Sequence, residues 1–268
     1  MKTVLTIAGS DPSGGAGIQA DIKTITVHGM YAMSAVTALT AQNTAGVSGI
    51  CETPADFLAA QLDSVFADIF PDAVKIGMLG SAAAVSVTAE KLEQYRPVNI
   101  VIDPVMISTS GNRLLSDEAL SEAVSRLFHL ADLLTPNIPE TESLCGFPIS
   151  GEDDMAAAAA CLCKRFGCAV LVKGGHLSGD AADLLMDRGR ITWYRSARIA
   201  NPNTHGTGCT LSSAIACGLA AGLGREESVK RAKSYLSGAI ADGLDLGKGA
   251  GPLNHMYALQ PFLSRLTI

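Results

Sequence analysis

The segment Thr204-His205-Gly206-Thr207-Gly208-Cys209-Thr210 combines the residue types of this chain that are best suited to chemistry. The apolar run from Leu211 to Ala221 follows it, so the segment is expected to be a loop that turns into a helix. The first turn of a helix presents unpaired backbone N–H groups at the positive end of the helix dipole, and phosphate is the anion usually bound there. A thiolate at Cys209 would be favoured in the same turn. The segment therefore predicts an anion site and leaves open whether the cysteine takes part in a reaction.

A packing role is the simpler interpretation of the same segment. Glycines serve wherever a loop must pass close to a helix. That role does not explain why Thr207, Cys209 and Thr210 all crowd the first turn.

A second glycine-rich loop, Gly9 to Asp21, follows an expected strand and opens an expected helix. Part of it matches the dinucleotide pattern G-x-G-x-x-A, but the turn is long and the acidic residue expected after the next strand is missing. A Walker A loop is excluded because no lysine follows the glycines. The loop is interpreted as an approach to a small ligand, with Asp21 and Gln42 as hydrogen-bonding groups. The alternative is a glycine-rich turn capped by Asp11.

Two further strand ends carry residues that suit a site. Lys75-Ile76-Gly77-Met78 could place the methionine against a flat ligand, although a core methionine is the commoner outcome. Asp103-Pro104-Val105-Met106, followed by the polar segment Ser108 to Asn112, indicates a site carboxylate and a mobile flap. An ordinary turn explains this second pattern equally well.

The last two strand ends suggest metal and phosphate chemistry. Asn137 and Glu140 are three residues apart at an expected helix start, and hard oxygen ligands suit Mg²⁺, usually through water. An N-cap asparagine with a capping-box glutamate is the alternative, and it is favoured when the pair is taken alone. Lys173 precedes two glycines and could reach a phosphate as a point charge. A surface lysine that keeps its charge in water is the alternative.

Short apolar runs alternate with helical patterns along the chain and must position these loops. Strands are expected over Thr3–Ala8, Ala35–Leu39, Val74–Ile76, Ile100–Ile102, Leu133–Leu134 and Ala169–Val172. Helices are expected over Gly15–His28, Pro54–Asp68, Ala82–Gln94, Asp117–Leu127, Ile138–Leu144, Met155–Phe166, Thr207–Gly222 and Glu226–Ala241. Leu184–Met186 and Ile191–Tyr194 flank a turn and predict a hairpin.

This alternation predicts an α/β fold with a mostly parallel sheet that is covered on both faces. Ligands of open α/β sheets bind beyond the carboxyl ends of the strands, where the polar loops fall. No linker or repeat interrupts the pattern, so residues 1–268 are expected to form a single domain.

Composition narrows the class of protein further. The chain is 48% hydrophobic and 17% charged with a net charge of -6, and no basic cluster suggests nucleic acid. No apolar run reaches the length of a membrane span, and Val4 to Ala8 is too short for a signal peptide. Seven scattered cysteines fit a reduced, cytoplasmic protein rather than a disulfide scaffold.

Taken together and in this order, the motifs resemble the ribokinase-like superfamily of small-molecule kinases. More closely, the chain resembles the hydroxymethylpyrimidine/phosphomethylpyrimidine kinases of thiamin synthesis. The matching segments are TIAGSDPSGGAGIQADIKT (Thr6–Thr24), TAQNT (Thr40–Thr44), KIGML (Lys75–Leu79), DPVM (Asp103–Met106), TPNIPE (Thr135–Glu140), VKGGH (Val172–His176), NTHGTGCTLSSAIA (Asn203–Ala216) and KGAGP (Lys248–Pro252).

The resemblance implies a ribokinase-like three-layer αβα sandwich with a mostly parallel central sheet and a small flap over the site. It also implies phosphorylation of 4-amino-5-hydroxymethyl-2-methylpyrimidine, and then of its monophosphate, with ATP as co-substrate and Mg²⁺ as cofactor. A homodimer is implied, and a monovalent-cation requirement is left open.

The resemblance also implies a role for each matching residue. Substrate-binding positions would be Gly9, Ala16, Asp21, Gln42, Met78 and Val105. Asn137 and Glu140 would organise Mg²⁺, with Asp103 as a further candidate, and Lys173, Asn137 and Thr207 would serve ATP. Gly206, Thr207, Gly208 and Cys209 would surround the transferred phosphoryl group. Whether Cys209 acts as the base stays open, because a helix N-terminus lowers its pKa while a nearby phosphate raises it.

One departure from the family concerns the flap. Thr109 stands where related kinases often carry a basic residue, and no cysteine of the kind used by some pyridoxal-phosphorylating relatives is present in Ile107–Ser110. The missing cysteine argues against pyridoxal phosphorylation without excluding it, so a pyridoxal/pyridoxine kinase is kept as the alternative enzyme. A nucleotide-dependent oxidoreductase and a catalytically silent vitamer sensor are the alternatives from other classes.

Overall fold

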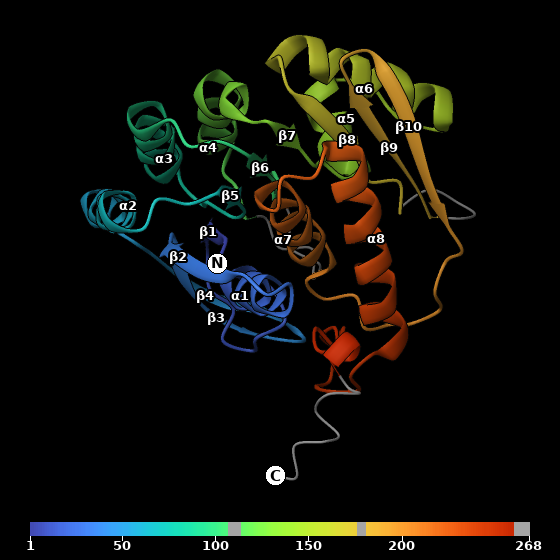
Figure 1. Cartoon of the computed structure of the whole chain (residues 1–268), viewed down its shortest axis with the longest axis horizontal. Coiled ribbons are helices and arrows are strands. Elements are labelled where there is room, and N and C mark those ends of the chain that lie inside the picture. Colours follow the sequence, from blue (N-terminus) through green and yellow to red (C-terminus); the bar gives the residue numbers. More distant parts are fainter. Residues whose placement is uncertain (107–113, 176–180, 260–268) are drawn as a thin grey trace.

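The computed structural model describes residues 1–106, 114–175 and 181–259. Its centre is an eight-stranded sheet in the order β10-β9-β8-β7-β6-β5-β1-β2 (Figure 1). The strands are β1 (Thr3–Ala8), β2 (Tyr31–Val36), β5 (Ala73–Ile76), β6 (Ile100–Ile102), β7 (Leu133–Leu134), β8 (Ala169–Val172), β9 (Ala181–Asp187) and β10 (Arg190–Ser196). Neighbours from β2 to β8 pair in parallel, whereas β9 and β10 are antiparallel.

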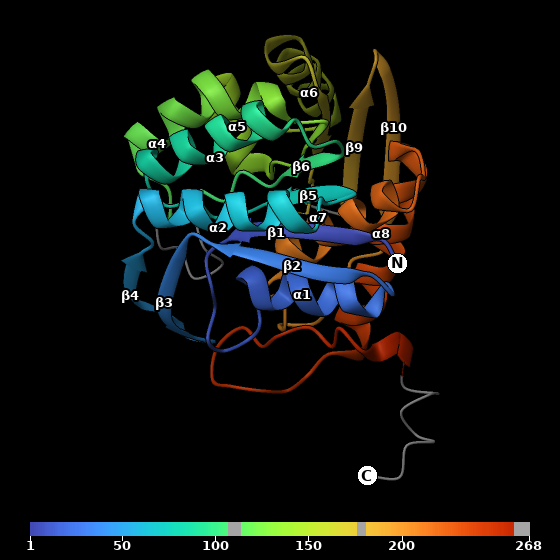
Figure 2. The ribbon, with the colours of Figure 1, turned by 60° about the vertical axis from the view of Figure 1, so that its left-hand side comes forward.

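Helices cover both faces of this sheet and complete a three-layer sandwich (Figure 2). One layer holds α2 (Ala55–Asp68), α3 (Ala82–Tyr95), α4 (Asp117–Glu122), α5 (Ile138–Cys145) and α6 (Glu152–Phe166). The other holds α1 (Gly17–Val27), α7 (Thr207–Ala220) and α8 (Arg225–Asp242). Alternate side chains of a strand point to opposite faces, so each layer packs against its own apolar core.

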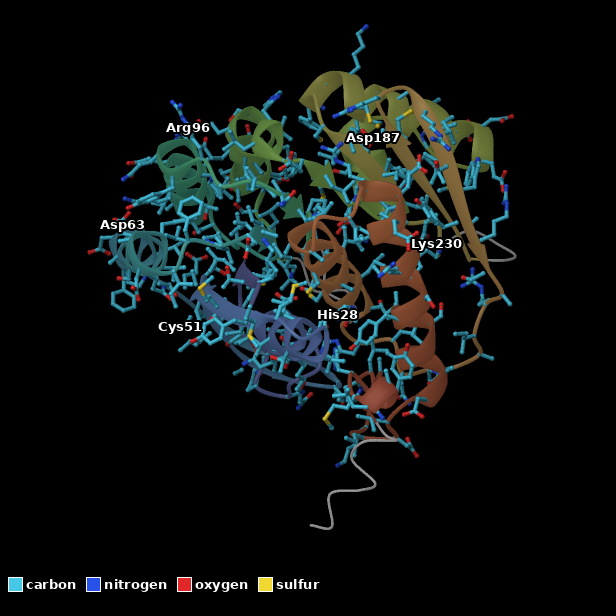
Figure 3. The ribbon with its side chains drawn as sticks, viewed as in Figure 1. His28, Cys51, Asp63, Arg96, Asp187 and Lys230 are labelled. Atoms are coloured by element: carbon cyan, nitrogen blue, oxygen red, sulfur yellow. The ribbon has the colours of Figure 1, made fainter. Side chains whose placement is uncertain are left out.

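Local sequence signals set several helix ends. Ser81 and Ser116 accept hydrogen bonds from the first turns of α3 and α4, as N-cap residues do. Gly146 and Gly167 end α5 and α6 in the left-handed conformation that glycine allows. Charged side chains such as Lys230 of α8 lie on the exposed faces of the helices (Figure 3).

The expected strand Ala35–Leu39 is wrong in its bounds. β2 ends at Val36. At Thr37 the N–H still donates to the Ala8 carbonyl, but the carbonyl accepts from the Thr53 N–H at 2.9 Å and the hydroxyl donates to the Met78 carbonyl at 2.7 Å, so the chain turns out of the sheet there. The chain then forms β3 (Ala38–Asn43), which pairs with β4 (Gly46–Glu52) in a separate antiparallel ribbon. Gln42 therefore lies on a strand of this ribbon and not in a loop.

Two helices also differ from the expectation. The segment Asp117–Leu127 divides into α4 and a π-helical turn at Ala123–Leu127, and α6 begins at Glu152, where three acidic residues favour the helix N-terminus. The hairpin is confirmed: Arg188 and Gly189 both have positive φ between β9 and β10, as a type I′ turn requires. Among the described residues, no helix is long and apolar enough to cross a membrane.

The six parallel strands end at one edge of the sheet. The segments that leave this edge include Gly9–Gly17 after β1, Met78 after β5, Asp103–Met106 after β6, Asn137 after β7 and Lys173 after β8. The polar motifs of the sequence are thus gathered in one place by the topology, as expected for an open α/β sheet.

Removing a buried aromatic ring should test how much the helical layer contributes to stability. Phe128 is 2% exposed and packs edge-on against Phe166, so Phe128→Ala should lower the free energy of unfolding by about 3–5 kcal/mol. The control Phe57→Ala changes a ring that is 61% exposed, and its effect should stay within about 1 kcal/mol. Urea denaturation measures both, and equal losses would contradict the packing described here.

Candidate active site

A cavity of about 880 Å³ lies at the carboxyl edge of the sheet. Its lining comes from every motif singled out in the sequence. The residues concerned include Gly9, Asp11, Ala16, Gln42, Met78, Asp103, Val105, Asn137, Glu140, Lys173, His205, Gly206, Thr207, Gly208 and Cys209. The structure brings these residues together around one cavity, whereas the roles expected for them stay predictions.

The N-terminus of α7 opens into this cavity. Gly206 is the N-cap residue with φ 83°, and no side chain caps the helix. Thr210 N–H donates to the Gly206 carbonyl, whereas the N–H groups of Gly208 and Cys209 have no protein acceptor among the described residues. The first turn carries no acidic side chain. Unpaired N–H groups and the helix dipole therefore favour an anion at this point.

The two glycine-rich segments fit into each other. A Cβ atom on Gly206 would lie 1.9 Å from the Gly15 carbonyl oxygen, and one on Gly17 would lie 2.3 Å from the Gly9 carbonyl oxygen. Both glycines also have positive φ, a region that L side chains avoid. Position 206 must therefore be glycine for two reasons, which are its positive φ and the close approach of the first loop.

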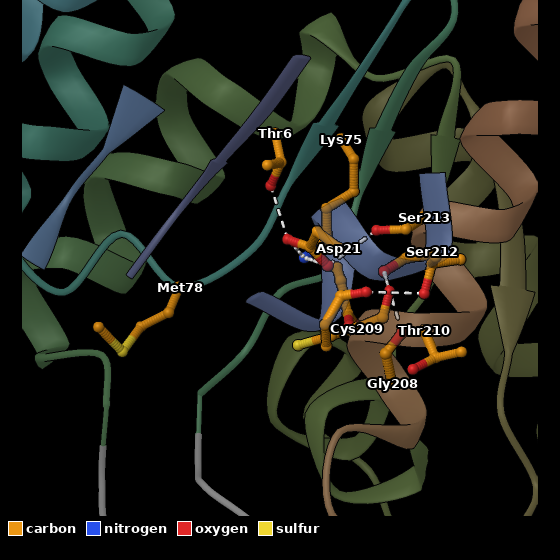
Figure 4. A network of polar contacts seen from close by, with 12 residues as sticks. Thr6, Asp21, Lys75, Met78, Gly208, Cys209, Thr210, Ser212 and Ser213 are labelled. Carbon is orange, nitrogen blue, oxygen red and sulfur yellow. Dashed lines mark hydrogen bonds and ion pairs between the residues drawn. The ribbon is translucent and has the colours of Figure 1, made fainter. Parts of the chain in front are cut away.

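A buried ion pair supports this helix from below (Figure 4). Lys75 Nζ lies 2.8 Å from Asp21 Oδ2, and both side chains are fully buried. The same carboxylate accepts from Thr6 Oγ1 at 2.6 Å and from Ser213 Oγ at 2.8 Å. These contacts join β1, α1, β5 and α7 at one carboxylate, because Asp21 is on α1 and Ser213 is on α7.

Asp21 differs from its expected role as a substrate contact. Its carboxylate is fully buried and is absent from the cavity lining. Both of its oxygens are occupied by Lys75, Thr6 and Ser213. The physical reason is that Lys75, in the middle of an apolar strand, needs a counter-charge. Burial disfavours the lysine charge, but the Asp21 carboxylate outweighs it and raises the pKa of Lys75.

Cys209 lies at the cavity above this pair. Burial raises the pKa of its thiol to about 11, although Lys75 acts in the opposite direction. The expected lowering of this pKa by the helix N-terminus is therefore overturned by desolvation. At neutral pH the Cys209 side chain is a thiol.

Asp103 and Lys173 form a second ion pair on the other side of the α7 N-terminus. Lys173 Nζ lies 2.7 Å from Asp103 Oδ1. A Cβ atom on Gly208 would lie 3.1 Å from Asp103 Oδ2 and 3.6 Å from Lys173 Nζ, so the helix start faces both groups. Burial lowers the pKa of Lys173, but Asp103 and Glu140 reverse this and raise it. Lys173 keeps its positive charge beside the anion site.

The capping-box interpretation of Asn137 and Glu140 is confirmed. Asn137 Oδ1 accepts from the Glu140 N–H at 2.9 Å, and Glu140 Oε2 accepts from the Asn137 N–H at 2.8 Å. Both residues also line the cavity. Burial raises the pKa of Glu140 to about 7 and Asp103 adds to this, whereas Lys173 lowers it. A cation beside Glu140 would relieve the cost of its charge.

This donor set fits a magnesium ion only in part. Within the described residues, no group of three histidine, cysteine, aspartate or glutamate side chains could enclose a metal. Asn137, Glu140 and Asp103 nevertheless bring oxygen atoms to the cavity. Mg²⁺ usually keeps several waters and is bound through one or two carboxylates plus substrate phosphates, and the residues present suit that mode.

Another part of the lining suits a flat ring. Gly9, Ala16, Gln42, Met78 and Val105 belong to the lining of the same cavity. A Cβ atom on Gly9 would lie 2.4 Å from the Met78 Cε atom, so glycine lets the methionine lie flat against the loop. The flap residues Ser108 to Asn112, Thr109 among them, and His176 lie outside the described residues.

Sequence reasoning missed several residues of the site. His205 Nε2 contacts Asp11 Oδ2 at 2.8 Å, and Lys233 Nζ pairs with Asp183 Oδ2 at 2.7 Å in the cavity wall. Their positions in glycine-rich or helical segments could not reveal these partners. The buried partner of Lys75 did have a signal in the sequence, because a lysine within an apolar strand needs a counter-charge.

Known proteins match this chain over most of its length. The family model "Phosphomethylpyrimidine kinase" matches residues 11–254. A "Thiamine biosynthesis bifunctional protein ThiED" from Geobacter sulfurreducens is 51% identical over 98% of this chain, which spans only 54% of that protein. A "Hydroxymethylpyrimidine/phosphomethylpyrimidine kinase" from Streptomyces coelicolor is 48% identical over 96% of this chain and 95% of its own length.

Two solved structures share the fold. A phosphomethylpyrimidine kinase from Clostridium difficile is 44% identical with a TM-score of 0.81, covering 90% of this chain and 100% of its own. An ADP complex of Bacillus subtilis pyridoxal kinase has a TM-score of 0.90 at 34% identity, with 97% and 99% coverage. The ribokinase-like fold expected from the sequence is thus confirmed.

Breaking the buried ion pair should destabilise the protein strongly. Lys75→Met leaves the Asp21 charge buried without its partner and should cost about 3–5 kcal/mol in urea unfolding. The combination Lys75→Met with Asp21→Asn should recover part of this loss. Lys2→Met is the control, because the Lys2–Asp72 pair is exposed and such pairs contribute about 1 kcal/mol or less. Equal effects of Lys75→Met and Lys2→Met would contradict the role given to the pair.

A comparison of two glycines with nearly equal φ separates the cost of backbone strain from the cost of a steric clash. Gly222 has φ 84° with no atom near its Cβ position, whereas Gly206 has φ 83° and faces the Gly15 carbonyl. Gly222→Ala should cost only the backbone strain of about 1–2 kcal/mol. Gly206→Ala should cost more and should also abolish phosphoryl transfer. Unfolding free energy and turnover of both variants test this, and an active Gly206→Ala enzyme would disprove the interlocking.

Proposed function

The chain belongs to the phosphomethylpyrimidine kinase family, a family of phosphotransferases, and from this premise we propose its reaction. It transfers the γ-phosphoryl group of ATP to 4-amino-5-hydroxymethyl-2-methylpyrimidine and then to the monophosphate of that pyrimidine. Its curated relatives carry the name of this activity, and an ADP complex among the neighbouring structures supports a nucleotide co-substrate.

The observation that carries the proposal is the continuity of the cavity. One space of about 880 Å³ joins the wall at Gln42 and Met78, which suits a flat ring, to the anion site at the start of α7. A hydroxymethyl group on a ring held at this wall can therefore point toward a phosphate held at the anion site. Substrate positions are assigned to Gly9, Ala16, Gln42, Met78 and Val105.

Phosphoryl transfer needs positioning and charge stabilisation more than covalent help. The hydroxymethyl oxygen bonds to the γ-phosphorus while the bond to the β,γ-bridging oxygen breaks and ADP leaves. Backbone N–H groups of Gly208 and Cys209 would stabilise the charge on the transferred group, with Gly206 and Thr207 forming the rest of the cradle. Lys173 is assigned to the ATP phosphates. Asn137 and Thr207 complete the nucleotide side.

Oxygen atoms of Asn137, Glu140 and Asp103 would hold Mg²⁺ through water. When bound there, the ion supplies positive charge that offsets the charge of the nucleotide phosphates. Glu140 lies near its own pKa at neutral pH, so its proton would leave as the cation arrives.

A neutral Cys209 thiol is the form that the site favours at the pH of the cell. In a loose transition state the attacking hydroxyl loses its proton late, and an oxygen of the transferred phosphoryl group can accept that proton, so a strong base is unnecessary. Cys209 is therefore proposed as a group that positions the hydroxymethyl oxygen, and no monovalent cation is required by this scheme.

Three further proposals concern the whole protein. The one eight-stranded sheet, to which strands from both halves of the described chain contribute, supports one kinase domain over 1–268. Exposed apolar side chains on the β3–β4 ribbon, Leu39 and Ile50 among them, favour a homodimer. Seven unpaired cysteines favour a reducing compartment such as the cytoplasm.

Phosphorylation of pyridoxal or pyridoxine is the second candidate. The observation in its favour is the TM-score of 0.90 with a pyridoxal kinase, although the identity to pyrimidine kinases is higher. An assay with ATP and Mg²⁺ against the aminopyrimidine, its monophosphate, pyridoxal and pyridoxine decides between the two. The aminopyrimidine should give the highest kcat/KM, a higher value for pyridoxal would reverse the assignment, and EDTA should abolish turnover.

The pH dependence of turnover should report the protonation state of Cys209. With a thiol pKa of about 11, a thiolate base would make kcat rise about tenfold per pH unit from pH 8 to 10. A neutral positioning thiol instead predicts a flat kcat over this range. Cys209→Ala should lower kcat and keep the same flat profile. A steep rise in the wild type that Cys209→Ala abolishes would establish the cysteine as the base.

A further inference from the structure

The side-chain amide of Gln42 lies between two hydrogen-bonding neighbours. Gln42 is on β3 with its side chain on the same face of the ribbon as Thr40, and it lines the cavity. The structure places Gln42 Nε2 at 3.4 Å from His205 Nε2 and Gln42 Oε1 at 3.2 Å from Thr40 Oγ1. An amide has two orientations of nearly equal shape, and its hydrogen-bond partners decide between them.

Asp11 fixes the proton on the histidine. Its carboxylate accepts from the N–H and hydroxyl of Ser13 and from the N–H groups of Gly15 and Ala16. Burial acts against the charge, but these bonds and His205 hold the pKa of Asp11 at about 2. An ionised carboxylate only accepts hydrogen bonds. His205 Nε2, at 2.8 Å from Asp11 Oδ2, must therefore carry a hydrogen.

Thr40 constrains the other terminal atom of the Gln42 amide. Its hydroxyl donates to the Ser10 carbonyl at 2.8 Å, so its single hydrogen is already used. The remaining capacity of Thr40 Oγ1 is to accept. An amide nitrogen placed beside His205 would set two N–H groups against each other, and the carbonyl oxygen would meet a hydroxyl with no hydrogen to give.

We propose that Asp11 and His205 set the orientation of Gln42, with its carbonyl oxygen toward His205 and its NH₂ group toward Thr40. His205 Nε2–H is then shared between Asp11 and Gln42, and each neighbour is satisfied. Asp11 and His205 are positioning residues in this scheme, because they act on a ligand only through Gln42.

The fixed amide carries a consequence for specificity, which rests on the proposed function. One N–H and one carbonyl lone pair of Gln42 remain unused, and together they match a ring nitrogen beside an exocyclic amino group. Glutamine reads the adenine edge in the same bidentate way. The 4-aminopyrimidine edge offers this donor–acceptor pair, whereas pyridoxal has no amino group beside its ring nitrogen. The orientation that Asp11 and His205 impose on Gln42 thus selects an aminopyrimidine over a pyridine vitamer.

Nuclear magnetic resonance tests the orientation without any turnover. In labelled wild-type protein, nuclear Overhauser effects from the Gln42 NH₂ protons should be stronger to the Thr40 methyl group than to the His205 ring. In His205→Phe this preference should weaken, since the N–H donor to the Gln42 carbonyl oxygen is lost. A stronger effect to the His205 ring in the wild type would overturn the proposal.

A double-mutant cycle tests whether His205 acts through Gln42. His205→Phe should raise the KM for the aminopyrimidine about tenfold and leave the KM for ATP within about threefold. In a Gln42→Leu background, His205→Phe should have no additional effect on that KM. His205→Gln places an amide donor near the Nε2 position and should restore most of the affinity.

The remaining outcomes are equally decisive. Additive effects of the two substitutions, or a His205→Gln variant as weak as His205→Phe, would assign His205 a structural role and overturn the proposal. His129→Phe is the matched control, because His129 is exposed and outside the cavity lining, and its KM values should stay unchanged. A wild-type protein that never phosphorylates the aminopyrimidine would disprove the proposed function, while the resonance experiment would still decide the orientation of Gln42.

Discussion

The buried pair of Asp21 and Lys75 is the constraint on which the rest of the site depends. Removing two charges from water costs several kcal/mol per ion, so the surrounding chain must supply every hydrogen bond that the carboxylate can accept. Thr6, Ser213 and Lys75 do this from three different elements. The start of α7 is consequently held in one place relative to the sheet. The backbone N–H groups of this anion site need such fixation, because a backbone donor cannot change its direction as a side chain can.

The architecture of the site follows from patterns that can be recognised in the sequence alone. Apolar runs of strand length alternate with helical periods, and this alternation confines the polar loops to one edge of a parallel sheet. Asn137 and Glu140 illustrate a local rule that holds in detail, since a capping box needs only residues three positions apart. Gly206 and Cys209 likewise fall at a helix start that their own neighbours specify.

What the sequence leaves undecided is the identity of distant partners. Asp21 looks like a ligand contact until Lys75, far along the chain, is placed beside it. The pKa of Cys209 depends on burial, which no local pattern reports. The β3–β4 ribbon escaped prediction because the chain turns out of the sheet at Thr37, where contacts with other segments hold it. Each of these is a property of contacts between segments, and periodicity describes segments one at a time.

The contact between Gly206 and Gly15 has a consequence for how the protein is made. The two residues are in such close contact that a Cβ atom on Gly206 would collide with the Gly15 carbonyl oxygen. Most of the chain nevertheless lies between them in the sequence. Contacts of such long sequence separation form slowly and late, because the loop between them must be ordered first. A ribosome-bound chain that lacks α7 would therefore possess the cavity wall of Gly9, Gln42 and Met78 without the helix N-terminus that faces it. Catalytic competence should appear in a single late step, when α7 docks onto the first loop.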